Sequence, residues 1–242
     1  MARRRFFVDE VREGRAQIGG DEAHHLSRVL RVEAGQRFEI SDNQSVYLAQ
    51  IEAVRKDLVT FSIVDRIVAD EPQVRITLLA SLIRFERFEW MIEKATELGV
   101  EHIIPVQADR SEKGLDLAAR KRKARWSRIA REASEQSRRA RLTAIADAAR
   151  LSVALASEIP HRFALDEDRA APPILRTLPE RRASGEQVAM AVGPEGGWTA
   201  REQALLLEKG WKTVSLGPTI LKTETAVVAA LAIVNAAWQA GA

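Results

Sequence analysis

Cysteine is absent from this chain of 242 residues, which excludes disulfide bonds, thiolate zinc sites, iron–sulfur clusters and cysteine nucleophiles. Long apolar runs are absent as well, because the longest, residues 226–234, is well short of the ~20 residues that a membrane span needs. The arginines at positions 3–5 precede only a short apolar stretch, too short for the core of a secretory signal. We therefore expect a cytoplasmic protein with no membrane partner.

Positive charge is in small excess overall but concentrated in one segment. The chain carries 37 Lys and Arg against 34 Asp and Glu, a formal net charge of +3. Residues 120–141 alone contain ten Lys and Arg against two Glu. Such a concentration of positive charge favours a polyanionic partner.

The hydrophobic pattern divides the chain near Pro72. Residues 1–70 alternate apolar and polar side chains with a period of two, which is typical of half-buried strands. Several short strands in so few residues predict a small barrel or sandwich. Residues 72–242 read instead as apolar runs alternating with amphipathic helices, which predicts a parallel sheet covered on both faces. The expected fold class is therefore α/β with a small N-terminal β domain.

One helix interrupts the N-terminal strands, with Asp21 as its expected N-cap. Its polar side is basic, because His24, Arg28 and Arg31 share one face at helical spacing and His25 lies beside them. We expect this face to contact RNA phosphates. The two histidines have no third ligand at a recognisable spacing, so we expect no metal.

In the second part, the sequence predicts strands at residues 74–82, 102–106, 162–165, 187–192 and 211–216, and helices at 85–98 and 117–140. The strand at 187–192 runs into a glycine-rich turn, after which Thr199 and Glu202 have the spacing of a helix capping box. Glycine-rich turns between strand and helix lie at the carboxyl edge of parallel sheets, where ligands bind.

The turn at residues 193–198 narrows the type of ligand. It has neither the Lys and Ser/Thr of a Walker phosphate loop nor the GxGxxG dinucleotide pattern. It also carries Glu195, which would repel a triphosphate but suits an uncharged or positively charged nucleoside. The alternative is a plain helix-entry turn with an exposed Glu.

A second loop, residues 216–226, follows the strand at 211–216 and leads into an almost wholly apolar helix. If the two strands are neighbours, the two loops form two walls of one pocket. A helix that is apolar on all sides must be buried on all sides, so this one is either central or pressed against another subunit. We favour a homodimer.

These segments resemble one family, ribosomal RNA small subunit methyltransferase E. The resemblance runs nearly end to end and is carried by residues 5–8, 24–31, 93–100, 132–137, 193–198 and 216–226. It implies an N-terminal PUA-like β-barrel and a C-terminal SPOUT α/β domain, with a mostly parallel sheet and a trefoil knot that holds S-adenosylmethionine. It also implies a homodimer whose partner is 16S ribosomal RNA within the small subunit.

The resemblance assigns site residues as well. Those expected to bind the cofactor are Gly193, Pro194, Glu195, Gly196, Gly197, Leu216, Gly217, Ile220, Leu221, Thr223, Thr225 and Ala226. Those expected to bind RNA are His24, His25, Arg28, Arg31, Arg110, Arg138 and Arg141. The chain departs from the family in carrying Thr219 and Lys222 where two arginines are usual.

The reaction that the family resemblance implies is methylation of N3 of one decoding-region uridine, number 1498 in the family. The imide proton must leave, so the protein needs an acceptor and groups that stabilise negative charge on the ring oxygens. Glu224 is the candidate acceptor, and Lys222 and Arg139 are the candidate stabilisers. Two alternatives stay open: an RNA-binding assembly factor without catalysis, and a SPOUT enzyme that modifies another RNA position.

Overall fold

The structure, a computed structural model, describes residues 4–156, 158–168 and 170–241. The chain divides into two compact units, one of Met1–Asp70 with Ser134–Leu142 and the other of Glu71–Ala133 with Thr143–Ala242. The sequence pattern placed Ser134–Leu142 in the second domain. Its hydrogen bonds explain the difference, because Ser41 Oγ donates to Ala140 O at 2.7 Å and Leu142 N donates to Asn43 Oδ1 at 2.7 Å.

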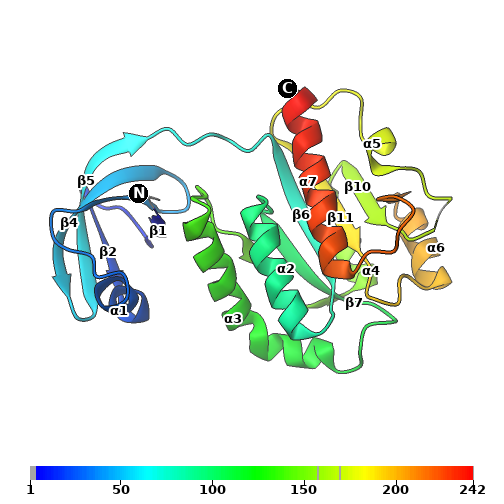
Figure 1. Cartoon of the computed structure of the whole chain (residues 1–242), viewed down its shortest axis with the longest axis horizontal. Helices are drawn as coiled ribbons and strands as arrows, with labels where there is room; N and C mark the ends of the chain where they lie inside the picture. Colours follow the sequence, from blue (N-terminus) through cyan, green and yellow to red (C-terminus); the bar gives the residue numbers. More distant parts are fainter. Residues whose placement is uncertain (1–3, 157, 169, 242) are drawn as a thin grey trace. The chain divides into compact units, whose positions relative to one another are not determined.

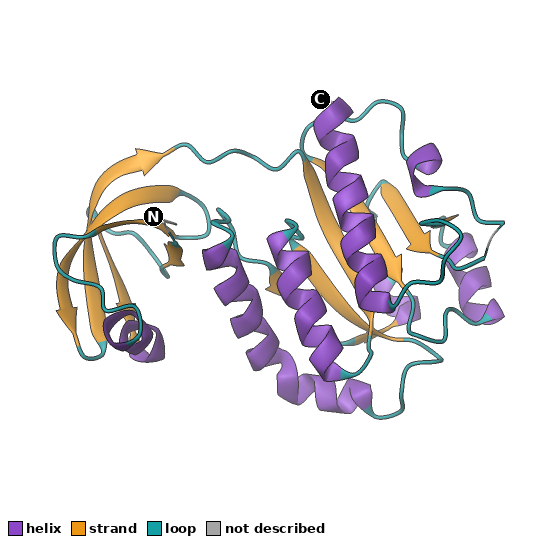
Figure 2. Ribbon diagram, viewed as in Figure 1, coloured by secondary structure: helices purple, strands orange, loops and turns teal. Residues whose placement is uncertain are grey.

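The first unit is a curved five-stranded sheet (Figures 1 and 2). Its strands run in the order β1-β3-β4-β5-β2, with β1 parallel to β3 and the other pairs antiparallel. Two register shifts between β4 and β5 bend the sheet, as bulges do. The bounds are β1 Arg5–Phe7, β2 Arg15–Gly19, β3 Arg37–Ser41, β4 Val46–Arg55 and β5 Leu58–Ile67.

Helix α1 (Gly20–Arg28) packs Ala23 and Leu26 into the core of this unit. The predicted cap is wrong: extended Gly19 precedes the helix without a side-chain cap, and Asp21 lies in the first turn, where its charge still favours the helix dipole. The predicted shared basic face is also wrong for Arg31, which lies beyond the helix with φ +50°. The chain turns there at the helix end, where Val32 N donates to Leu26 O at 3.2 Å and the Val32 side chain is buried.

The second unit has a parallel sheet in the order β12-β10-β11-β6-β7-β8, with β9 also paired to β7. Its strands are β6 Val74–Ser81, β7 His102–Gln107, β8 Ala144–Ile145, β9 Ala149–Arg150, β10 His161–Leu165, β11 Glu186–Val192 and β12 Lys212–Val214. The helices are α2 Phe85–Glu97, α3 Leu115–Gln136, α4 Leu151–Ala154, α5 Ile174–Thr177, α6 Ala200–Glu208 and α7 Thr223–Gly241.

Side chains of the central strands alternate between two cores, so both faces of the sheet are covered. Ile76 and Leu78 belong to the core with α2, α3 and α7, whereas Leu79 belongs to the core with α4 and α6 (Figure 1). The predicted α/β class with a mostly parallel sheet is therefore confirmed. Helix α3 ends four residues earlier than the predicted 117–140, because Arg138 takes φ +57° and turns the chain.

Helix α7 is buried on one side only, which differs from a helix enclosed all round. Val227, Leu231, Val234 and Trp238 are buried, whereas Ala232 lies on an exposed stripe with residues 225, 236 and 239. Within the described residues, no helix has the combined length and hydropathy that crossing a membrane requires.

Candidate functional site

A cavity of about 320 Å³ opens at the carboxyl edge of the second unit's sheet. Three loops form it, one after each of the parallel strands β10, β11 and β12. The two glycine-rich loops were expected after neighbouring strands, and that expectation is wrong, because β10 lies between β11 and β12. The loop after β10 therefore becomes a third wall of the pocket.

The first loop, residues 193–198, depends on two glycines. A Cβ on Gly193 would lie 3.2 Å from Trp198 Cε2, so a larger residue would push the indole away. Gly197 has φ +67°, and a Cβ there would lie 2.8 Å from Glu167 Oε1. The loop enters α6 through the predicted capping box, which is confirmed: Thr199 accepts from Glu202 N, and Glu202 Oε2 accepts from Thr199 N at 2.9 Å.

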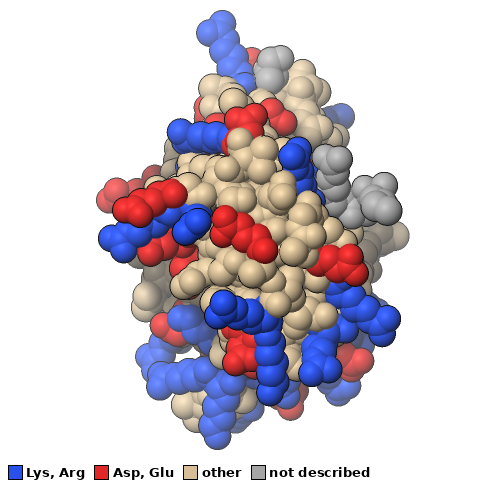
Figure 3. All heavy atoms as spheres, turned by 90° about the vertical axis from the view of Figure 1, so that its left-hand side faces the viewer, with Lys and Arg blue, Asp and Glu red and all other residues tan. Residues whose placement is uncertain are grey.

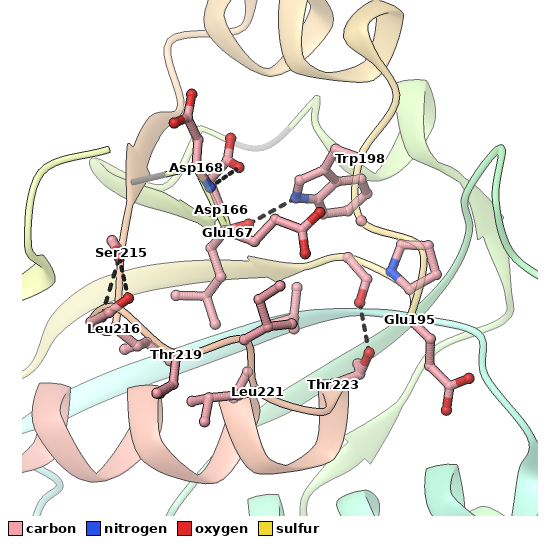
Figure 4. A pocket seen from close by; sticks show the side chains of 18 of the residues that line it. Asp166, Glu167, Asp168, Glu195, Trp198, Ser215, Leu216, Thr219, Leu221 and Thr223 are labelled. Carbon is pink, nitrogen blue, oxygen red and sulfur yellow. Dashed lines mark hydrogen bonds between the residues drawn. The ribbon is translucent and has the colours of Figure 1, made fainter. Parts of the chain in front are cut away.

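The second loop, residues 215–222, is tied to the first by the helix that follows it. Thr223 Oγ1, at the start of α7, donates to Gly193 O at 3.1 Å (Figure 4). Ser215 Oγ accepts from Gly217 N at 3.2 Å, and Gly217 has φ +130°, which favours glycine. Thr219, which replaces a usual arginine, lines the cavity, as do the apolar side chains of Leu216 and Leu221.

The third loop carries three consecutive acidic residues that the sequence analysis did not single out. Both carboxylate oxygens of Asp166 accept hydrogen bonds: Oδ2 from Gln203 Nε2 and Oδ1 from Asp168 N, each at 3.0 Å. Glu167 is exposed and lies beside Trp198 in Figure 4. Three carboxylates directly after an apolar strand were the signal that could have identified this loop.

The cavity has acidic walls with no cationic partner inside it. Its described lining includes Asp166, Glu167, Asp168 and Glu195 but no Lys or Arg. Uncompensated carboxylates repel phosphates and attract cations. The cavity therefore suits an uncharged or cationic nucleoside, as the glycine-rich turn alone indicated.

Glu195 is not the acidic group that faces the centre of this cavity. Figure 4 shows its side chain directed away from Asp166, Glu167 and Asp168. It forms an ion pair with Arg87 of α2, whose Nε also lies 3.8 Å from Glu224 Oε1. The sequence did not indicate a role for Arg87, because a single arginine in the first turn of a helix is usually exposed to solvent.

The structure brings most of the expected cofactor residues together. All line the cavity except Gly196 and Thr225. The carbonyl of Gly196 instead accepts a hydrogen bond from Arg110 Nη1 at 2.6 Å, so Arg110 braces the first loop. Thr225 is exposed in the first turn of α7.

The expected catalytic residues are not gathered in the cavity lining. Glu224 is mostly buried at the start of α7, and its Oε2 has no hydrogen-bond partner in the described part of the chain. Lys222 is exposed in the second loop. Arg139 belongs to the first unit, where its Nε donates to Arg141 O at 3.2 Å.

The expected RNA-binding residues are spread over two regions of the first unit, with Arg110 in the second. His24, His25, Arg28 and Arg31 are all exposed at and after α1, next to Val29, which is 64% exposed. Figure 3 shows one face of the molecule, on which Lys and Arg side chains gather at the lower end with acidic side chains among them. Such mixed charge is compatible with phosphate contacts at particular arginines.

Arg138 has a structural contact that its sequence did not indicate. It forms an ion pair with Glu39, which also accepts hydrogen bonds from Arg5 Nε and Nη2 at 3.2 and 2.9 Å. Burial of Glu39 opposes its ionisation, but the hydrogen bonds and charges of Arg5 and Arg138 outweigh burial and hold the pKa of Glu39 below its usual value. Arg5 Nη1 also donates to Arg138 O at 2.7 Å, so the network fixes Ser134–Leu142 to β1 and β3.

No group of three or more His, Asp or Glu side chains in residues 4–156, 158–168 and 170–241 could hold a metal ion. The described lining of the cavity consists of carboxylates, small polar groups, backbone and apolar side chains.

Known proteins resemble this chain along almost its whole length. Residues 70–235 match the model of an RNA methyltransferase domain, and residues 18–64 match that of an RNA methyltransferase PUA domain. The ribosomal RNA small subunit methyltransferase E of Bacillus subtilis is 32% identical over 231 residues, which cover 90% of this chain and 88% of that protein. The protein of the same name from Aquifex aeolicus is 31% identical and covers 94% of this chain and 97% of its own.

Solved structures share the fold. A ribosomal RNA small subunit methyltransferase E from Neisseria gonorrhoeae, bound to S-adenosyl methionine, aligns with a TM-score of 0.87 at 29% identity over 98% of both chains. A putative methyltransferase from Legionella pneumophila, also with the cofactor, aligns with a TM-score of 0.88 at 26% identity over 98% of both chains.

Proposed function

The chain belongs to the ribosomal RNA small subunit methyltransferase E family, and from this premise we propose that it transfers the methyl group of S-adenosylmethionine to N3 of a single uridine in 16S ribosomal RNA. The observation that carries the proposal is the acidic, glycine-lined cavity at the edge of the parallel sheet. The first unit, which matches a PUA domain, would dock the RNA.

The cavity fits the proposed methyl donor by charge and shape. S-adenosylmethionine is a nucleoside with a sulfonium and no phosphate, and the lining carries carboxylates and no cation among the described residues. Leu216, Leu221 and Val192 supply apolar walls for a base. Gly193 and Gly197 leave room that a Cβ would fill. S-adenosylmethionine would supply a methyl group already activated by its sulfonium.

The protein's task in this reaction is to align the uracil and to take its imide proton. Glu224 is the proposed acceptor, because one of its oxygens is buried with no partner in the described chain. Lys222 and Arg139 are the proposed cations for charge that develops on the ring oxygens. The ring nitrogen forms the bond to the methyl carbon, and the sulfur of the donor keeps the electron pair of the bond that breaks.

RNA docking would use the exposed tip of α1 together with the basic surface of α3. The exposed side chains of His24, His25, Arg28 and Arg31 would contact phosphates. Val29, exposed among them, would supply an apolar contact. On α3, Arg120, Lys121, Arg122 and Arg125 are all exposed, and the last two form ion pairs with Glu89. We propose that Arg120 and Lys121 contact the RNA backbone.

We also propose that the enzyme is a cytoplasmic homodimer with a trefoil knot, as its family membership implies. The exposed stripe of α7 supports the dimer, because its small side chains, Ala232 and Ala236, would allow close approach of a second helix. Sedimentation of the purified protein should give twice the 26.9 kDa of one chain. A monomer at micromolar concentration would contradict this part of the proposal.

The decisive experiment maps the methyl group. Purified protein is incubated with labelled S-adenosylmethionine and unmodified 30S subunits, and the label is located by nuclease digestion and mass spectrometry. We expect N3-methyluridine at one decoding-region position. Label on another atom would indicate a SPOUT enzyme with a different target. Calorimetry without donor binding would indicate a non-catalytic RNA-binding factor, which the replacements Thr219 and Lys222 would explain.

A further inference from the structure

One guanidinium joins the first glycine-rich loop of the cavity to the start of α7, the helix that follows the second loop. Arg87, in the first turn of α2, pairs through Nη1 with Glu195 of the first loop, and its Nε lies 3.8 Å from Oε1 of Glu224 at the start of α7. An arginine can hold two carboxylates because its planar fork presents donors in several directions, whereas a lysine is a single point charge. The contact therefore ties together segments that lie far apart in the sequence.

Glu224 has an incomplete set of contacts. Its side chain is only 13% exposed, and the 3.8 Å separation from Arg87 is longer than a direct hydrogen bond. Its second oxygen, Oε2, is buried and has no hydrogen-bond partner in the described chain. Leaving a buried acceptor without a donor costs free energy, so this oxygen has the capacity to accept a hydrogen bond from a bound ligand. The imide N–H of uracil is a donor of this kind.

We propose that Arg87 is a positioning residue for methyl transfer, an inference that rests on the proposed function. It holds Glu224 through Oε1, and Oε2, buried and without a hydrogen-bond partner in the described chain, would accept the imide proton as it leaves N3 once the RNA is bound. Its ion pair with Glu195 keeps the first loop next to the start of α7. The hydrogen bond from Thr223 Oγ1 to Gly193 O is a second, uncharged contact between the start of α7 and the first loop.

The test compares Arg87 with Arg84, a matched arginine on the same helix end. Arg84 is exposed and precedes the first turn of α2, and its side chain makes no hydrogen bond or ion pair with any described residue. Arg87→Ala should lower kcat on 30S subunits about 100-fold, as misalignment of a catalytic group does, with a much smaller rise in the dissociation constant of S-adenosylmethionine from loosening of the first loop. Arg87→Lys should recover part of the loss, and Arg84→Ala should behave as the wild type.

A double variant separates positioning from a general structural effect. Because Arg87 acts through Glu224, Arg87→Ala combined with Glu224→Gln should be no slower than Glu224→Gln alone. Losses that multiply, or an unchanged kcat in Arg87→Ala, would overturn the proposal. If Arg87→Ala does not fold, Arg87→Lys and its combination with Glu224→Gln provide the same comparison.

Amide hydrogen exchange tests the same contact without relying on activity. Arg87→Lys should raise exchange in both loops, residues 193–198 and 215–222, whereas Arg84→Ala should raise it in neither. Unchanged exchange in both loops would contradict the tie. If the wild-type protein leaves uracil N3 unmethylated, the proposed function is wrong. The exchange experiment would still show whether Arg87 holds the loops.

Discussion

Gly197 and Glu167 lie so close together in the cavity wall that a Cβ on Gly197 would be 2.8 Å from Glu167 Oε1. The glycine belongs to the loop after β11 and the glutamate to the loop after β10. This pair links the glycine-rich loop after β11, which the sequence predicted, with the acidic loop after β10, which it did not.

Substituting Gly197→Ala should weaken both the fold and the cavity. The alanine would have to adopt φ +67°, and its Cβ would displace the carboxylate of Glu167. We expect a stability loss of about 1 kcal/mol and only about a threefold weaker affinity for S-adenosylmethionine in calorimetry, because the exposed Glu167 side chain can shift at little cost. Gly185→Ala is the control, because Gly185 has φ +81° and open space around its Cα. Equal affinity losses in the two variants would show that backbone strain alone is responsible.

Removing the charge of Glu167 should reduce discrimination between the methyl donor and its demethylated product. Both ligands carry an amino acid end, but only the donor carries a sulfonium, which a nearby carboxylate attracts. Because Glu167 is exposed, we expect Glu167→Gln to weaken donor binding only about threefold, and product binding less. Calorimetry with each ligand measures the ratio. The control is Glu180→Gln, at an exposed site outside the cavity, and a ratio unchanged in both variants would refute the assignment.

Acid should weaken the first unit through Glu39. The hydrogen bonds and charges of Arg5 and Arg138 hold its pKa below the ordinary 4.5. The stabilisation is therefore complete above about pH 4.5 and is lost as the pH falls through the lowered pKa of the folded state. Glu39→Gln should cost about 2 kcal/mol in urea unfolding at pH 7, and its difference from the wild type should shrink in acid. Glu10→Gln, at an exposed site of the same unit, should have no such effect; a cost for Glu39→Gln that does not depend on pH would contradict the ion-pair explanation.

The tip of α1 should contribute to RNA affinity but not to donor affinity. Arg28→Ala with Arg31→Ala should reduce the slope of log affinity against log salt by about 2, because each lost phosphate contact removes about one counterion. Filter binding to the RNA at several salt concentrations gives the slope, and calorimetry gives the donor affinity. Arg12→Ala with Arg55→Ala removes the same charge from exposed sites elsewhere in this unit. The same slope in both double variants would mean that α1 has no special role.

Local signals predicted most elements of the second unit. The capping box of Thr199 and Glu202 fixed the start of α6, and the apolar runs located β6, β10 and β11 within a residue or two. These features depend only on side chains a few positions apart, so they can be recognised in the sequence. Errors occurred at helix ends, where a residue with positive φ turns the chain: Arg31 after α1, next to the local bond from Val32 N to Leu26 O, and Arg138 after α3.

The composition of the site was harder to predict, because it depends on strand order. Nothing in the sequence placed β10 between β11 and β12, so the acidic residues after β10 seemed to belong to an ordinary connection. Arg87 was missed for the same reason, since its partners Glu195, in the first loop, and Glu224, in the first turn of α7, lie more than a hundred residues later.

The sequence by itself determined the α/β class, the two glycine-rich turns and the kind of ligand they admit, because spacing and residue type fix local backbone conformation and charge. Only the tertiary structure decided which third loop completes the cavity, which carboxylate faces it, and which arginine holds Glu195 and Glu224. Those outcomes follow from the order in which parallel strands pair, and strand pairing is a long-range choice made by burial of the whole sheet rather than by any single segment.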